Sequence, residues 1–218
     1  MCDREELIRE LKGTCEKEGK FICLLGGKSF GKSKCLNTLA KEANQGIAFF
    51  PNYEENRNNA PLSGNKEMLV LVVDMRAQGD KSILSGLIKA INHYNGPYSD
   101  LPKQIAKHCL IALTDNYGKP FNLSGKSVEN AFNEMESSLS PKDRIDLTQT
   151  LIQELFQKMK LTIIVDEANS AFDRSLLNQE QLLQAQADLA LLTRLTKQER
   201  QVFAMIPFFL LFFLICYF

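Results

Sequence analysis

Short apolar runs alternate along this chain with longer segments whose apolar residues recur at helical spacing. The runs are rich in aliphatic side chains, which is typical of strands buried on both faces of a sheet. They predict three strands, at residues 20–25, 68–74 and 161–167. The periodic segments predict helices at residues 3–18, 32–44, 80–94 and 178–196. This alternation indicates an α/β fold with a mostly parallel sheet.

The segment between the second and third predicted strands is longer than a single crossover helix requires. Residues 100–160 are mostly helical in pattern, with breaks at Gly118–Lys119–Pro120 and at Ser140–Pro141. We therefore expect a helical insertion at about residues 97–160. Two interpretations fit this surplus: a lid or partner surface, or a plain elaboration of one face of the domain.

The last predicted helix carries a thick stripe of leucines. A partner-binding helix and a helix packed against the sheet both fit this stripe. We favour packing, because a crossover helix is required after a parallel strand.

The composition of the 218 residues adds limits to this picture. The 26 basic and 26 acidic side chains give a formal charge of zero, so a nucleic-acid-binding surface is not favoured. The six cysteines show no C-x-x-C spacing, which favours reduced thiols and an intracellular, cytoplasmic protein. The first twenty residues carry charges throughout, so we expect no signal peptide. The length suits one domain, at residues 1–201.

A glycine-rich motif directly follows the first predicted strand. Residues 26–33 read G-x-x-x-x-G-K-S, the spacing of a phosphate-binding loop. The glycines let backbone N–H groups curl round phosphate oxygens, and the next helix presents its positive N-terminal end. We expect Lys32 to reach the β- and γ-phosphates and the Ser33 hydroxyl to meet Mg²⁺. The predicted nucleotide-binding residues are Gly26, Gly27, Lys28, Ser29, Phe30, Gly31, Lys32 and Ser33.

A second motif lies where the third predicted strand ends, at Asp166 and Glu167. A buried strand would deliver Asp166 to the Mg²⁺ side of a phosphate site, so the predicted metal residues are Ser33 and Asp166. Glu167 would polarise a water for attack on the γ-phosphate, which makes Glu167 and Lys32 the predicted catalytic residues. The alternative is a polar strand end that only caps the next turn.

Two shorter patterns resemble nucleotide-binding motifs and depart from them at one position each. Residues 65–68 read Asn-Lys-Glu-Met and lack the aspartate of an N-K-x-D guanine-reading motif, so ATP is favoured over GTP. A second Gly-Lys-Ser, at residues 125–127, has Pro120 where a phosphate-binding loop needs a glycine. We interpret that second pattern as the start of a helix.

These motifs resemble those of the additional-strand P-loop ATPases, the AAA+/STAND group that includes archaeal-type ATPases. The charged helix at residues 3–11 and the strand at 69–76, with Asp74 and Arg76 at its end, are similar to that group as well. The resemblance implies a three-layer P-loop NTPase fold, ATP and Mg²⁺ as cofactors, and ATP hydrolysis. It also leaves open a nucleotide-dependent switch or assembly module with little turnover, which would act with a protein partner or by self-assembly.

The end of the chain departs from the pattern of that group, in which further strands and a helical lid follow. Residues 202–218 are almost wholly apolar and contain Pro207. Three interpretations compete: a buried fourth strand that runs into an apolar tail, a C-terminal membrane anchor, and the end of a truncated product with an incomplete C-terminal part. The anchor would make the protein a tail-anchored membrane protein, although 17 residues are at the short limit for a span of ~20 residues.

Overall fold

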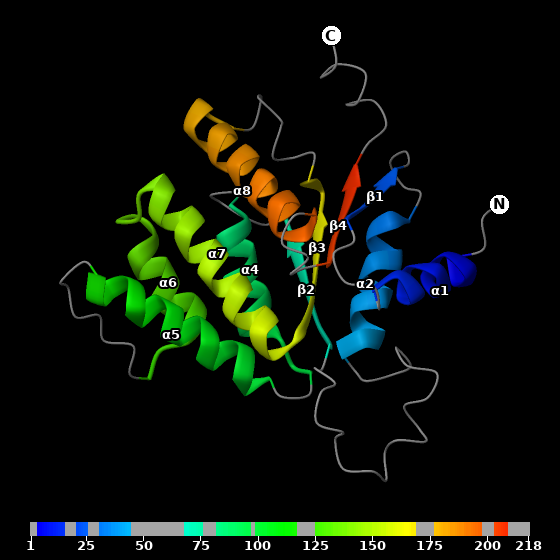
Figure 1. The fold of residues 1–218 in the computed structure, drawn as a ribbon, viewed down its shortest axis with the longest axis horizontal. Helices are drawn as coiled ribbons and strands as arrows, with labels where there is room; N and C mark the ends of the chain where they lie inside the picture. Colours follow the sequence, from blue (N-terminus) through cyan, green and yellow to red (C-terminus); the bar gives the residue numbers. More distant parts are fainter. Residues whose placement is uncertain are drawn as a thin grey trace.

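The structure is a computed structural model, and it describes residues 4–15, 21–25, 31–44, 68–75, 82–96, 99–116, 125–168, 177–197 and 203–208. Its centre is a four-stranded sheet in which every pair of neighbouring strands is parallel. The strands are β1 (Phe21–Leu25), β2 (Met68–Asp74), β3 (Lys160–Asp166) and β4 (Phe203–Phe208), in the order β1-β4-β3-β2. The expected α/β fold with a mostly parallel sheet is therefore confirmed (Figure 1).

Strand β4 lies inside the sheet, between the strand nearest the N-terminus and β3. Of the three interpretations of the apolar C-terminal segment, the strand is confirmed for residues 203–208, and residues 209–218 lie outside the described part. Pro207 fits this position because β4 pairs with β3 only as far as Met205 and continues beyond it beside β1 alone. A proline has no N–H for a second neighbour, so a strand tolerates it best where one side is unpaired.

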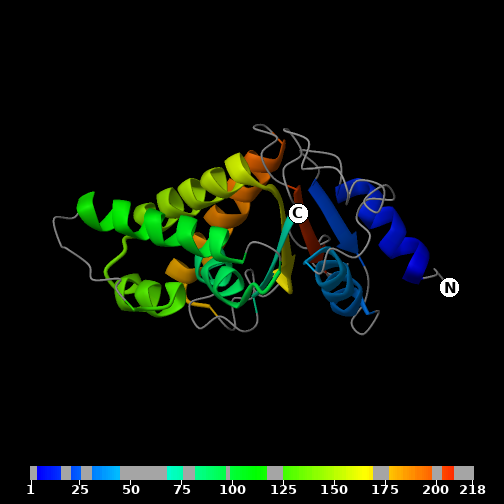
Figure 2. The ribbon, with the colours of Figure 1, turned by 90° about the horizontal axis from the view of Figure 1, so that it is seen from below.

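Helices cover both faces of the sheet (Figures 1 and 2). One face packs against α1 (Arg4–Cys15) and α2 (Lys32–Asn44). The other packs against a larger layer built from α4 (Ile83–His93), α5 (Asp100–Asn116), α6 (Val128–Glu136), α7 (Pro141–Lys158) and α8 (Gln179–Lys197). Three of these helices, α5, α6 and α7, form the expected insertion between β2 and β3.

The strands divide their side chains between the two helical layers by simple alternation. Val70, Val72 and Ile164 belong to the cluster with α1 and α2. Leu71 and Ile163, one position along, belong to the cluster with α4 to α8. Successive side chains of a strand point to opposite faces, so even-numbered residues of β2 and β3 face α2.

Serine caps begin three of the helices in the larger layer. The side chains of Ser82, Ser127 and Ser140 accept hydrogen bonds from backbone N–H groups in the first turns of α4, α6 and α7. Ser127 belongs to the second Gly-Lys-Ser pattern, so the interpretation of that pattern as a helix start is confirmed. Its side chain satisfies one of the N–H groups that a helix leaves without an internal acceptor.

The leucine stripe of α8 packs inside the molecule, as expected for a crossover helix. Ala185, Leu189, Leu191, Leu192 and Leu195 are buried in the core beside the sheet. Leu183 is the exception, because 59% of it is exposed. In the described residues, no helix combines the length and the apolar character that crossing a membrane requires.

Candidate functional site

The candidate site is built at the N-terminal end of α2, directly after the glycine-rich motif. Gly31 has a φ of 80°, a left-handed conformation that glycine adopts without a steric penalty. Its carbonyl accepts the hydrogen bond of the Cys35 N–H at 2.9 Å, so the helix begins at the next residue. Lys32 and Ser33 therefore occupy the first turn of α2. Gly26, Gly27, Lys28, Ser29 and Phe30 lie outside the described residues.

One hydrogen bond joins the two sequence motifs. The Ser33 hydroxyl donates to Oδ1 of Asp166 at a distance of 3.1 Å, although the two residues are 133 positions apart in the chain. Asp166 ends β3 and is only 4% exposed. The structure therefore places the two residues predicted to meet Mg²⁺ side by side, with a hydroxyl and a carboxylate as oxygen donors. Oxygen donors of this kind suit Mg²⁺.

The backbone around Asp166 is held from two sides. Its carbonyl oxygen accepts a hydrogen bond from the N–H of Met75, just beyond β2, at 3.1 Å. Its Oδ1 also accepts the N–H of Glu167 at 3.0 Å. The bond from Met75 holds the backbone of Asp166, and the bond from Glu167 orients its carboxylate.

Glu167 follows the strand and lies half-buried, with a backbone φ of 53°. A residue with a Cβ is uncommon in this left-handed region, and such strain is concentrated at functional sites. Glu167 thus stands at the carboxyl end of β3, beside the residue that contacts α2. The predicted catalytic Lys32 begins α2, so the described predicted site residues gather at one edge of the sheet.

The first turn of α2 has an unusual charge for its position. It carries Lys32 and Lys34 and no acidic residue, although the N-terminal end of a helix is itself positive. Most of the other described helices carry an acid in their first turn: Glu5 and Glu6 in α1, Asp100 in α5, Glu129 in α6, Asp143 in α7 and Glu180 in α8. The arrangement in α2 is unfavourable alone and becomes favourable when an anion binds there.

Two residues that the sequence analysis did not assign to a site also stand out. Asp74 ends β2 and pairs in register with Asp166, and it was noted only as part of the resemblance. Asp74 has the same sequence pattern as Asp166, which is a carboxylate at the end of an apolar strand. Asp188 lies in α8 and is fully buried, and its only signal is an acid within a leucine-rich helix.

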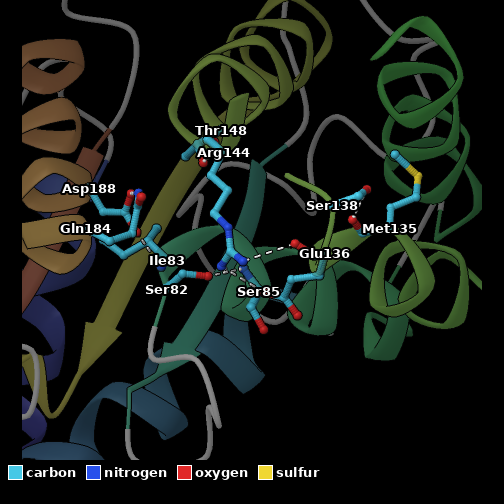
Figure 3. A network of polar contacts seen from close by, with 10 residues as sticks. All are labelled: Ser82, Ile83, Ser85, Met135, Glu136, Ser138, Arg144, Thr148, Gln184 and Asp188. Carbon is cyan, nitrogen blue, oxygen red and sulfur yellow. Dashed lines mark hydrogen bonds and ion pairs between the residues drawn. The ribbon is translucent and has the colours of Figure 1, made fainter. Parts of the chain in front are cut away.

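Asp188 lies away from α2, at the N-terminal end of α4 (Figure 3). Its carboxylate accepts hydrogen bonds from the Ile83 N–H and from the Gln184 side chain, both at 2.8 Å. Burial raises the pKa of Asp188 to about 6, against the opposing effect of these two bonds and of the Arg144 charge. Arg144 in turn bonds to the carbonyl of Glu136 at 3.0 Å.

Two cysteines with described side chains, Cys35 and Cys109, are buried as thiols. Burial, and then the charge of Glu154, raise the pKa of the Cys109 thiol to about 11. A thiol with such a pKa stays protonated near neutral pH and is a poor nucleophile. Burial of both side chains fits the expectation of structural thiols.

Comparison with known proteins identifies no family for this chain. No protein-family model matches the chain, and no curated protein matches it. Among the described residues, no group of three or more His, Cys, Asp or Glu side chains is placed to hold a metal ion. The case for a site therefore rests on Ser33, Asp166 and the charges around them.

Proposed function

We propose that the chain is an ATP-binding P-loop protein of the additional-strand AAA+/STAND group that hydrolyses Mg²⁺-bound ATP. The observation that carries the proposal is the hydrogen bond from Ser33 to Asp166. A phosphate-binding loop and an acidic strand end work together only if the fold brings them to one place. The two motifs were identified independently, and a chance pair of motifs would have no reason to meet.

The order of the strands supports the same proposal. Strand β4 is inserted between β1, which leads into the glycine-rich motif, and β3, which ends in Asp166. This inserted strand is the feature to which the name of the additional-strand group refers. Helices on both faces of the sheet fit the three-layer fold of P-loop NTPases.

Each part of the proposed site has a separate role. The backbone N–H groups of residues 26–31 and the positive end of α2 hold the phosphates, and Lys32 neutralises their charge. Ser33 and Asp166 would hold Mg²⁺, which would supply charge withdrawal from the phosphate oxygens. Glu167 would accept the proton of the attacking water as general base, and it directly follows Asp166 at the carboxyl end of β3.

The test is a titration of the full-length chain with a fluorescent ATP analogue in Mg²⁺, together with a measurement of ATP turnover. Lys32→Ala should weaken binding about 10- to 150-fold, because a charge-assisted hydrogen bond contributes about 1.5–3 kcal/mol. Lys34→Ala is the matched control, since it removes an equal charge from the same turn of α2. It should weaken binding less than tenfold.

Glu167→Gln separates binding from chemistry. It should bind the nucleotide as the wild type does and lose turnover by about 10²–10⁴-fold, the usual contribution of a general base. Equal affinity in the wild type and Lys32→Ala would contradict the proposal of a nucleotide site. Binding without turnover in the wild type would retain the site and replace hydrolysis with the switch function.

A further inference from the structure

Asp74 and Asp166 end two neighbouring strands at the same height. They are the last register pair between β2 and β3. Neighbouring parallel strands lie about 5 Å apart, and paired residues share a face of the sheet. Both residues are even-numbered, as are Val70, Val72 and Ile164, which pack on the α2 side. The two carboxylates therefore lie on the face of the sheet that carries the N-terminal end of α2.

The position of Asp74 is fixed by the backbone as firmly as that of Asp166. The β2–β3 pairing continues past Asp74, because the N–H of Met75 donates to the carbonyl of Asp166. Met75 itself is fully buried, which anchors the chain directly after Asp74. Asp74 is half-buried at this edge, whereas Asp166 is buried.

This edge of the sheet presents charges of both signs. Lys32, Lys34 and the positive end of α2 favour an anion and repel a free cation. Asp74 and Asp166, a register pair at the ends of β2 and β3, favour a cation and repel a free anion. A ligand that carries both signs, a phosphate with its divalent cation, complements both sets of charges at once.

From this juxtaposition we infer that Asp74 supplies a second carboxylate to the metal side of the site and, with Asp166, holds the divalent cation that accompanies the nucleotide. The inference rests on the proposed function and deepens it. In this inference, Asp74 determines how strongly nucleotide binding depends on Mg²⁺. The loop and Lys32 bind the phosphates directly.

The test compares nucleotide binding with and without metal in the full-length chain. A fluorescent ATP analogue is titrated in EDTA and then at increasing Mg²⁺, with the wild type, Asp74→Asn and Asp146→Asn. Asp146 is an exposed acid in α7, and its substitution removes the same charge away from this edge. Thermal unfolding midpoints are measured in EDTA for all three proteins.

Asp74→Asn should raise the Mg²⁺ concentration for half-maximal binding about tenfold, and binding in EDTA should be unchanged or tighter. Its unfolding midpoint in EDTA should not fall below that of the wild type, because the inference assigns Asp74 to the ligand and not to the fold. Asp146→Asn should match the wild type in Mg²⁺ dependence.

Three results would overturn the inference while the nucleotide site stands. They are an unchanged Mg²⁺ dependence in Asp74→Asn, an equal loss of binding in EDTA and in Mg²⁺, and unfolding or a lowered midpoint of the variant in EDTA. The last two would assign Asp74 to the nucleotide contact or to the fold. A wild type that binds no nucleotide under any of these conditions would instead remove the proposed function and this inference together.

Discussion

Among the described residues, Glu167 is the one non-glycine residue with a positive φ. The left-handed conformation costs a residue with a Cβ about 1–2 kcal/mol. Glu167 keeps it because its neighbours leave no alternative: Asp166 is bonded to Met75 on one side, and Ala168 is fully buried on the other. A glycine would suit this backbone better, so the carboxylate is retained at the expense of stability.

Glu167→Gly should therefore stabilise the protein and inactivate it. We expect the free energy of unfolding, measured by urea denaturation without nucleotide, to rise by about 1 kcal/mol, because glycine adopts this φ without steric penalty. Turnover of ATP should fall as it does in Glu167→Gln. An increase in stability coupled to a loss of activity is the expected sign of strain held at a functional site.

Two controls separate strain from other effects of the substitution. Glu167→Gln keeps the Cβ and should leave the stability within about 0.5 kcal/mol of the wild type. Gln186→Gly, at an exposed position of α8, should destabilise by about 1 kcal/mol, the usual effect of glycine in a helix. A lower stability for Glu167→Gly than for the wild type would contradict the strain argument.

At the scale of elements, Asp188 joins α8 to the start of α4. The first turn of α4 contains no acid of its own, and Asp188 supplies one from another helix by accepting the Ile83 N–H. Ser82 caps the same helix through the N–H of Ser85. The end of α4 is thus satisfied by one local and one distant acceptor, as a buried helix end requires.

The buried carboxylate makes stability depend on pH in a defined direction. The pKa of Asp188 is raised to about 6 in the folded protein, chiefly by burial, above its ordinary value of 3.8. Between these values the folded state holds a proton that the unfolded state has lost, so this contribution to stability falls as the pH rises from about 4 to about 6. The fall amounts to about 3 kcal/mol and is complete above that window.

Asp188→Asn removes this titration and isolates it from all other groups. Relative to the wild type, the variant should gain about 3 kcal/mol in unfolding free energy between pH 4 and pH 7, measured by urea denaturation at several pH values. Asp146→Asn, at an exposed site, is the matched control for the loss of one carboxylate. A difference between Asp188→Asn and the wild type that does not change with pH would exclude Asp188 as the titrating group.

Local pattern predicted most of the elements and missed how some of them meet. The strand predicted at residues 68–74 is Met68–Asp74, and the helix predicted at 32–44 is Lys32–Asn44. The helix predicted at 80–94 is Ile83–His93 in the structure, because Ser82 and Tyr94 cap its ends. Of the helix predicted at 3–18, the structure describes Arg4–Cys15. The burial of Asp188 was not predicted, because nothing in the neighbouring sequence distinguishes a buried acid from an exposed one in a leucine-rich helix.

At the scale of the whole molecule, the arrangement of the sheet was beyond the reach of local pattern. Strand β4 pairs Ala204 with Phe21, from the opposite end of the chain, and with Ile163. Nothing in the composition of an apolar segment specifies its partners, since pairing depends on contacts between distant residues. The two site motifs were readable from sequence, whereas the meeting of Ser33 and Asp166 depends on the folded arrangement of strands and helices.

Among the described side chains, more apolar residues are buried in the layer of α4 to α8 than in the layer of α1 and α2. In the layer of α4 to α8, α4 alone buries Ile83, Leu84, Gly86, Leu87, Ile88 and Ile91. On the other face, the described side chains of α1 and α2 bury Leu11, Cys35, Leu36, Leu39 and Ala40. Apolar burial is the main source of stability, so from the described side chains we expect the layer that carries Lys32 and Ser33 to be less stable than the layer of α4 to α8.

Hydrogen exchange should therefore be uneven across the molecule and respond to nucleotide in one layer. Without ligand, we expect the amides of α1 and α2 to exchange faster than those of α4 and α7, as measured by mass spectrometry of peptic fragments. Mg-ATP at about 100 times its Kd should slow the exchange of α2 about 100-fold where opening destroys the site, because it adds about 2.7 kcal/mol to that opening. Lys32→Ala should abolish this slowing and leave the exchange of α4 unchanged. Equal protection of the two layers without ligand would contradict the argument from burial, whereas a nucleotide effect confined to α5 and α6 would place the ligand elsewhere.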